Sequence, residues 1–172
     1  MVAGIYALSI AAIGLADAAW AGNQSICLQS LSATAKPIFS GLSEVKVDAN
    51  DGSFTEGGEY RLYFSSRGTL VYVFATQYGE AVKRVASIKL LNGSAHSYSA
   101  TVSSYRYVEP VHAGAVKVAD VETSSFIVCD DAVVKGVGSE GVSQDTRDEA
   151  KSILYKGVEE YNAMKRNNGA SP

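Results

Sequence analysis

Short segments in which apolar and polar residues alternate run through most of this chain and constrain its fold more than any other feature. In residues 59–65, Tyr60, Leu62 and Phe64 occupy every second position, and a period of two places such side chains on one face of a β-strand. Further strands are predicted, with turn residues such as Asn92-Gly93 between them, over residues 44–48, 70–75, 82–91, 97–108, 115–121 and 125–129. A spacing of about 10 to 15 residues predicts a mainly β domain, an antiparallel β-sandwich or barrel-like fold.

The period changes near the C-terminus. Apolar residues there recur at steps of three and four: Ala150, Ile153, Leu154, Val158, Tyr161 and Met164. Thr146 and Glu149 have the spacing of a helix capping box. We predict a C-terminal α-helix from Asp145 to Arg166, within residues 143–168, after a Gly-rich linker at 136–142. Its apolar stripe either packs on the β domain, which we expect, or docks a partner.

The N-terminal segment predicts export. From Val2 to Ala16 no side chain is charged, and Ala19 and Ala21 are small residues at the positions that signal peptidase requires. We therefore expect residues 1–21 to be a signal peptide and the β domain to occupy residues 22–135. A retained membrane anchor is the competing interpretation, but the apolar run falls short of the roughly 20 residues that span a bilayer.

Two cysteines, Cys27 and Cys129, lie near the two ends of the exported part. Export places them in an oxidising compartment, so we predict a disulfide and a periplasmic or extracellular location. Two buried free thiols are the alternative. Residues 26–35, around Cys27, fit either one short helix or a first strand.

Composition excludes several classes of protein. Hydrophobic residues make up 47% of the 172 residues and charged residues 19%, which fits one folded domain rather than a disordered tail. The formal net charge is −3, and no basic run exceeds the pairs Lys83-Arg84 and Lys165-Arg166. We therefore expect no nucleic-acid partner and no membrane insertion after signal cleavage.

Three stretches of residues 44–91 follow one another in a characteristic order: Phe54-Thr55-Glu56-Gly57-Gly58-Glu59-Tyr60-Arg61-Leu62, Val71-Tyr72-Val73-Phe74 and Gly79-Glu80-Ala81-Val82. In this order they resemble an uncharacterised bacterial exported family, domain of unknown function 4384. Where that family continues with a Pro-containing segment, this chain has Val85-Ala86-Ser87. The resemblance implies an accessory domain of cell-envelope proteins and carries over no catalytic residue.

Motifs that suggest cofactor or metal binding have simpler explanations. Gly136 to Gly141 matches the dinucleotide fingerprint G-x-G-x-x-G, but a Rossmann unit needs a second parallel strand after the helix, where this chain ends. Four residues have part of a calcium-loop spacing without its central glycine, and fit a hairpin turn better: Asp48, Asn50, Glu56 and Glu59. We predict neither a cofactor nor a metal.

Catalytic constellations are equally weak. His96 and His112 are the only histidines, and neither has a Cys, Asp or Glu at metal-ligand spacing. Asp130 and Asp131 are adjacent, so on a strand they point to opposite faces. We predict no catalytic residue and no enzyme activity, with a small hydrolase as the least favoured alternative.

One stretch has the composition of a recognition surface. Tyrosine, serine and arginine are enriched around Tyr98, Tyr105, Arg106 and Tyr107, and tyrosine gives rigid contact area at low entropic cost. We predict these four residues as a partner surface. The alternative is that Tyr105 and Tyr107 cover the core.

The sequence thus predicts a non-enzymatic exported binding or accessory domain of the bacterial cell envelope that acts through protein-protein contacts. A periplasmic inhibitor or immunity-type protein that blocks a toxic enzyme is the alternative, and it would present an acidic or aromatic plug to a cleft.

Overall fold

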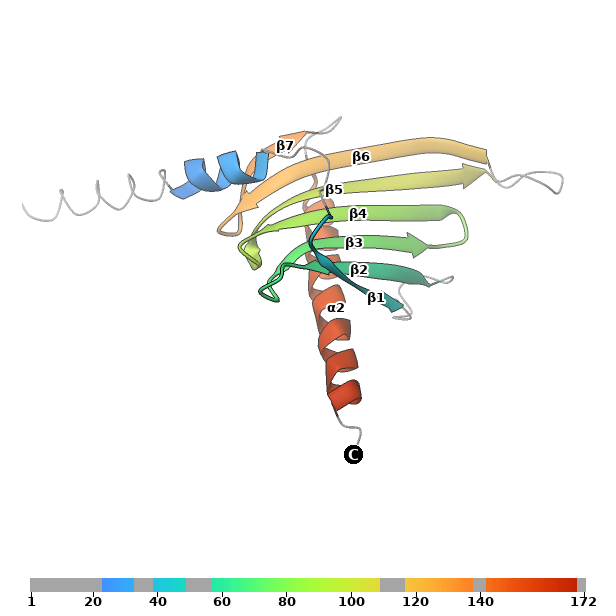
Figure 1. Ribbon diagram of the computed structural model, residues 1–172. Coiled ribbons are helices and arrows are strands. Elements are labelled where there is room, and N and C mark those ends of the chain that lie inside the picture. The colour runs from blue at the N-terminus through green and yellow to red at the C-terminus, as the bar shows by residue number, and fades with distance from the viewer. Residues whose placement is uncertain (1–22, 33–38, 49–56, 109–116, 138–141, 170–172) are drawn as a thin grey trace, which may run out of the picture.

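The computed structural model describes residues 23–32, 39–48, 57–108, 117–137 and 142–169. They form one antiparallel sheet whose seven strands follow each other in chain order, and a long helix that crosses it (Figure 1). The elements are β1 (Ser43–Asp48), β2 (Gly58–Phe64), β3 (Leu70–Tyr78), β4 (Val82–Leu91), β5 (Ser94–Val108), β6 (Lys117–Cys129), β7 (Ala132–Val137) and α2 (Gln144–Gly169). A short N-terminal helix covers residues 23–32.

Two tight turns have the backbone conformation of two-residue hairpins. Asn92 and Gly93 join β4 to β5 with φ values of 53° and 75°, as their sequence predicted. Asp130 and Asp131 join β6 to β7 with φ values of 50° and 64°. Aspartate tolerates this left-handed region better than most residues with a Cβ, and Ser97 Oγ accepts a hydrogen bond from the Asp130 amide at 3.1 Å.

The C-terminal helix begins earlier than predicted. Ser143 is its N-cap, because the Ser143 hydroxyl accepts a hydrogen bond from the Thr146 amide at 3.1 Å. The expected capping box of Thr146 and Glu149 is therefore wrong. Glu149 pairs instead with Arg84 of β4. The helix ends with Arg166 in its last turn, where a cation favours the helix dipole.

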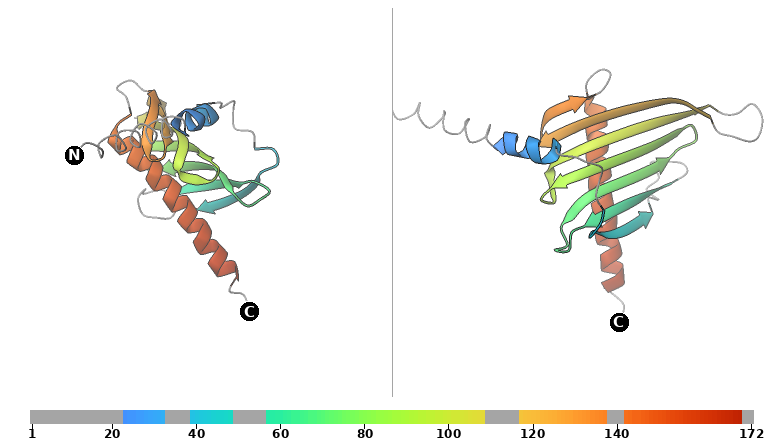
Figure 2. Two further views of the ribbon diagram at one scale, coloured as in Figure 1. Left: turned by 90° about the vertical axis from the view of Figure 1, so that its left-hand side faces the viewer. Right: turned by 45° about the horizontal axis from the view of Figure 1, so that its top comes forward.

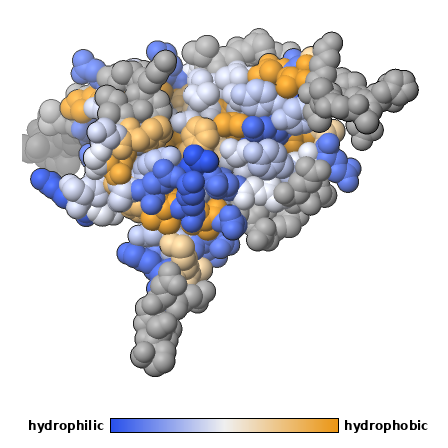
Figure 3. Space-filling view, turned by 45° about the vertical axis from the view of Figure 1, so that its right-hand side comes forward, coloured by the Kyte–Doolittle hydropathy of each residue, from blue (hydrophilic) through white to orange (hydrophobic). Residues whose placement is uncertain are grey.

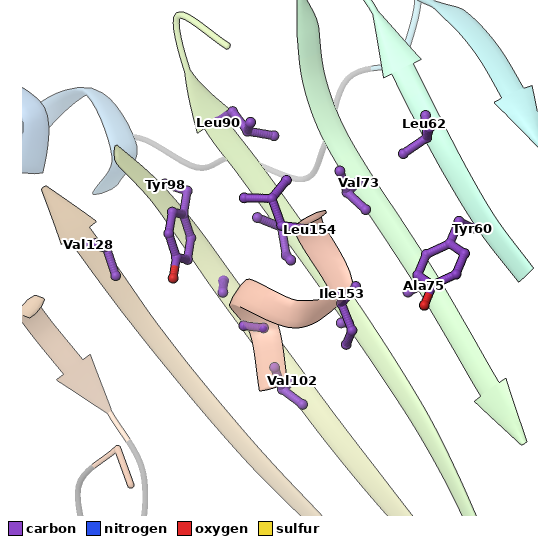
Figure 4. Close-up of a cluster of buried hydrophobic side chains, with 14 of the residues drawn as sticks. Tyr60, Leu62, Val73, Ala75, Leu90, Tyr98, Val102, Val128, Ile153 and Leu154 are labelled. Atoms are coloured by element: carbon purple, nitrogen blue, oxygen red, sulfur yellow. The ribbon is translucent and has the colours of Figure 1, made fainter. Parts of the chain in front are cut away.

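The apolar stripe of α2 packs on one face of the sheet, the inner face. Leu154 is fully buried among side chains of β2 to β5, and Ile153 lies beside it (Figure 4). Gly157 lies so close to β2 that a Cβ there would be 3.2 Å from Leu62 Cδ2. A residue unfavourable to helices is thus placed where the backbone must approach the sheet.

The predicted class, mainly antiparallel β with a C-terminal helix, is confirmed. The sheet is not closed, and the layer that a second sheet would form in a sandwich is α2. Residues 115–121 and 125–129 were predicted as separate strands, but residues 117–129 form the single strand β6. Gly136 and Val137 belong to β7 rather than to a linker, and the rest of the glycine motif lies outside the described residues.

The opposite, outer face of the sheet carries the N-terminal helix (Figure 2, left). Cys27 of this helix is bonded to Cys129 of β6, with a Cα–Cα distance of 6.1 Å. Leu31 and Ile127 complete a small second core around the bond. The predicted disulfide is confirmed, and of the two structures left open for the segment around Cys27, the helix is the one formed.

Leu154→Ala should lower the free energy of unfolding by roughly 2–5 kcal/mol, because it leaves a cavity at a fully buried position. Ser152→Ala, at an exposed position of the same helix, is the control and should change it by less than about 0.5 kcal/mol. Urea unfolding of both variants measures the difference. Equal effects would show that α2 is not part of the core.

Replacing Cys27 and Cys129 together by alanine should lower the free energy of unfolding by about 2–5 kcal/mol, since the bond closes a loop with a sequence separation of 102. Thermal or urea unfolding measures this loss, and a reductant should reproduce it in the wild type. The same reductant should leave the free energy of unfolding of the double variant unchanged. A loss of stability there would show that the reductant acts on something other than the disulfide.

Candidate binding face

The outer face of the sheet is divided into a covered and an open part. Side chains in register across the strands form rows, and one row contains Tyr63, Tyr72, Lys89 and Ile127. Phe39 stacks on Tyr63 at 4.3 Å between ring centroids. In the middle of this row Lys89 Nζ donates a hydrogen bond to the Ser30 carbonyl of the N-terminal helix, and at the other end Ile127 packs with Cys27 and Leu31. The N-terminal segment therefore covers this row.

The acidity of the Tyr63 hydroxyl reflects its burial in the covered row. Burial is the main cause that raises the pKa of the Tyr63 hydroxyl, and the charge of Glu44 adds to it. Phe39 also meets the ring of Tyr72 edge-on at 5.7 Å. The cover at this end of the row is thus a small aromatic cluster.

Beyond the covered row lie three rows without a described segment over them, which we call the open face. Its members are Phe74, Ser87, Thr101 and Ser125, then Thr76, Val85, Ser103 and Thr123, then Tyr78, Lys83, Tyr105 and Val121. They point away from α2 because the residues between them form the core. Figure 3 shows apolar and hydrophilic residues side by side on this part of the surface.

On β5 and β6, small hydroxyl side chains make the first two rows of the open face flat. Thr101 and Ser125 are hydrogen-bonded through their hydroxyls at 3.0 Å, and Ser103 and Thr123 at 2.9 Å. These pairs join β5 to β6. At the β5 and β6 positions of these two rows, no side chain is longer than threonine. A flat, weakly polar surface suits contact with another flat surface.

Apart from Lys83, the third row is apolar, and it is more prominent; with the adjoining Tyr107 and Val118 we call it the tyrosine end. Tyr78 is 41% exposed, Val118 44% and Val121 48%. Lys83 Nζ lies 5.4 Å from the centre of the Tyr78 ring, a cation-π contact. Exposed tyrosine and aliphatic side chains together are what protein interfaces use at their centres.

Lys83 is the one charged side chain among the open-face positions on β3 to β6. The acids of β6, Asp120 and Glu122, point to the inner side, opposite Arg106 and Ser104. On β2 the first two rows continue with Arg61 opposite Phe74 and Glu59 opposite Thr76, and these two charges form an ion pair with each other. The open face is thus neutral to weakly basic, although the whole chain is acidic.

The structure separates the four residues predicted as a partner surface. Tyr98 is only 3% exposed and packs against Phe126 in the core, so its assignment to a surface is wrong. Arg106 points to the inner side. Tyr105 and Tyr107 alone lie on the outer face, beside Val118 and Val121, which sequence reasoning missed.

A polar cleft on the other side of the sheet is the second candidate. It has a volume of about 250 Å³ and lies between the start of α2 and strands β4 to β6. Four hydroxyls and four charged side chains line it: Ser104, Ser124, Ser143, Thr146, Arg84, Glu122, Asp145 and Glu149. Arg84 Nη1 lies 3.0 Å from Glu149 Oε1. This ion pair ties α2 to the sheet.

Two opposing effects set the acidity of Glu149. Burial raises the pKa of its carboxyl group and is the larger effect, while the charge and hydrogen bond of Arg84 lower it. A carboxylate with a dedicated cationic partner holds helix and sheet together and is a poor general base. We therefore interpret the cleft as a structural contact between α2 and the sheet.

The residues considered for metal or catalytic chemistry are dispersed. His96 Nδ1 lies 2.7 Å from Asp131 Oδ2, and Lys151 lies 3.5 Å from the other oxygen. The hydrogen bond to His96 is the main cause that lowers the pKa of Asp131. Asp48 and Glu59 are opposite each other on β1 and β2, but Glu59 is bonded to Arg61. No metal-ligand group of three occurs among the residues described.

Asn50, Glu56 and His112, and the predicted signal peptide, lie outside the described ranges. Within those ranges, neither helix has the length and apolar character needed to cross a bilayer. Comparisons of the chain with protein-family models, with curated proteins and with solved structures found no match. The resemblance of residues 44–91 to an exported family therefore stays a prediction.

Arg84→Met should raise the pKa of Glu149 above its wild-type value, because it removes the cation and preserves most of the burial. NMR titration of the Glu149 carboxyl carbon measures the shift. Arg106→Met is the matched control, because Arg106 does not line the cleft. An unchanged or lowered pKa in the Arg84 variant would contradict the ion pair.

Proposed function

We propose that this protein is an exported, non-enzymatic binding module of the bacterial cell envelope that acts through protein-protein contacts, and that the open face makes them. The observation that carries the proposal is the tyrosine end, where exposed Tyr78, Val118 and Val121 adjoin Tyr105. Apolar side chains gathered on an otherwise polar surface are typical of interaction sites.

The chemistry of the tyrosine end favours a protein partner. Val118 and Val121 offer aliphatic contact area, which suits apolar side chains, whereas a sugar ring stacks on aromatic faces. The flat hydroxyl rows beside them can form the polar rim that surrounds an interface core. The expected partner therefore presents a flat apolar patch with a carboxylate for Lys83.

Export is supported by the cysteines. The bond between Cys27 and Cys129 is stable in an oxidising compartment, and disulfides are rare in the reducing cytosol. The apolar segment before Ala21 has the features of a signal peptide. The resemblance to an exported family points to the same location and to an accessory role.

A binding role also agrees with the polar groups of the described residues. The best candidates for acid-base chemistry, Glu149 and His96, are held in ion pairs with Arg84 and Asp131. The flat open face fits a flat partner surface better than the cleft of an enzyme. The inhibitor alternative would need a protruding plug, so it becomes one outcome of the test.

The test places a photo-crosslinking amino acid at position 105, with position 133 as control, because Val133 is an exposed valine of β7 away from the open face. We expect irradiation in an envelope extract of the source bacterium to give a protein adduct from position 105 only. If the protein crosslinked at position 105 is a toxic enzyme, the result would support the inhibitor alternative. An adduct with polysaccharide alone would overturn the protein-binding proposal.

Val121→Asp should weaken binding of the crosslinked partner roughly tenfold or more, since it places a charge at the centre of an apolar contact. The same substitution at Val133 is the matched control and should leave affinity unchanged. Isothermal calorimetry or surface plasmon resonance with the purified partner measures both. If the two variants are equally stable, the lower affinity of Val121→Asp comes from a lost contact with the partner and not from unfolding. If Val121→Asp binds the partner as tightly as the wild type does, the tyrosine end is not the binding site.

A further inference from the structure

Strand β1 is a terminal strand of the sheet. It pairs with β2 on one side, from Ser43 opposite Phe64 to Asp48 opposite Glu59. On its other side no strand pairs with it among the described residues. A free edge presents a row of backbone amide and carbonyl groups that can pair with another strand.

Helix α2 extends past this edge. Its 26 residues give a length of about 39 Å, whereas seven strands spaced about 4.8 Å apart span roughly 29 Å. Figures 1 and 2 show the C-terminal turns of α2 projecting beyond β1. Tyr161 still packs on Phe64 at 4.7 Å between ring centroids, and Met164, one turn further on, remains partly exposed. The helix therefore has room for a further strand beneath it.

The side chains of β1 are complementary to themselves. Glu44 and Lys46 point outward and are exposed, while Val45 and Val47 point to the inner face. When two copies of this strand pair antiparallel about Val45, Glu44 of each copy lies opposite Lys46 of the other. Opposite charges at directly facing positions stabilise an antiparallel pair. The inner face then has Val45 opposite Val45.

The registers of the same pair about Lys46 and about Glu44 are unfavourable, and pairing about Val47, although it sets Lys46 opposite Asp48, joins fewer residues of β1. Pairing about Lys46 places Lys46 against Lys46 and Glu44 against Asp48, and pairing about Glu44 places two glutamates together. A shift by one residue sets outward side chains against inward ones. A lone lysine on an edge strand normally prevents association, but glutamate two residues before it makes one register attractive.

We propose that β1 pairs with β1 of a second copy of this chain, in antiparallel register about Val45, and forms a two-fold symmetric dimer. The edge-to-edge contact is isologous and therefore closes, unlike a contact of β1 with β7, which would propagate. The two sheets become one continuous sheet of twice seven strands. The two-fold axis runs through the sheet, so both open faces lie on the same side.

This proposal does not depend on the function of the open face, although a dimer would present two such faces and bind a multivalent partner more tightly. The helix ends contribute as well. Each projecting end of α2 would lie over the junction, where Met164 gains a neighbour from the second copy. The charge pattern, however, carries the specificity.

The experiment uses charge reversal in the full exported protein with its disulfide intact. Glu44→Lys alone should place lysine opposite lysine, and Lys46→Glu alone should place glutamate opposite glutamate. The dissociation constant of the dimer should rise at least about tenfold in each single variant. An equimolar mixture of the two single variants should form a heterodimer, because every facing pair is again opposite in sign. The Glu44→Lys/Lys46→Glu double variant should dimerise like the wild type.

Sedimentation velocity over a concentration series measures the dissociation constants, and native mass spectrometry identifies the heterodimer. Lys135→Glu, the same reversal in the other edge strand β7, is the matched control and should leave dimerisation unchanged. Both β1 positions are exposed, so loss of folding is not expected and circular dichroism checks it. A wild type that stays monomeric at about millimolar concentration, or single variants that dimerise as tightly as the wild type, would overturn the proposal.

Discussion

The contact between α2 and the inner face of the sheet is the interaction on which the rest of this structure depends. A single antiparallel sheet must bury one face against another layer to be stable in water, and here one helix provides that layer. Leu154 and Ile153 lie over the middle strands, and Gly157 lets the helix approach β2. Because α2 covers the middle of the inner face, where the core lies, the fold needs no second sheet against the outer face. The fold therefore leaves most of a sheet surface available for contacts with other molecules.

The elements of this fold could largely be predicted from periodicity, because a period of two or of 3.6 reports directly on which side chains share a face. What covers a face is a different question, and alternation alone does not distinguish a second sheet from a helix. The break expected within β6 was wrong for a related reason. Thr123 and Ser125 look like turn residues by composition, but their hydroxyls pair with Ser103 and Thr101 across the strand. Strand β7 was missed because its turn uses Asp130 and Asp131 in place of a glycine.

The orientation of the residues of the candidate surface could be predicted from the sequence for the tyrosines but not for the valines. Tyr98 and Tyr105 are seven positions apart on one continuous strand, so parity alone places them on opposite faces, and this signal was available. Val118 and Val121 are different. Three positions apart, they would face opposite ways in a regular strand, but Arg106 pairs with Asp120 and Tyr107 with Val118, which leaves Ala119 as an extra residue. This bulge turns both valines outward. No local pattern predicts it, because it depends on the register with β5.

The disulfide does more than stabilise the chain, because it also determines how much of the outer face is open. Cys129 is an outward residue of β6, so a partner in the N-terminal helix holds that helix against the outer face. The helix then covers Ile127 and engages Lys89 through the Ser30 carbonyl. With Lys89 engaged by Ser30 and Arg61 by Glu59, Lys83 is the remaining cation of β2 to β6 beside the hydroxyl rows. Long-range attraction of an acidic partner is consequently weak, and selectivity must come from the shape and apolar area of the tyrosine end, where short-range contacts set the rate of dissociation.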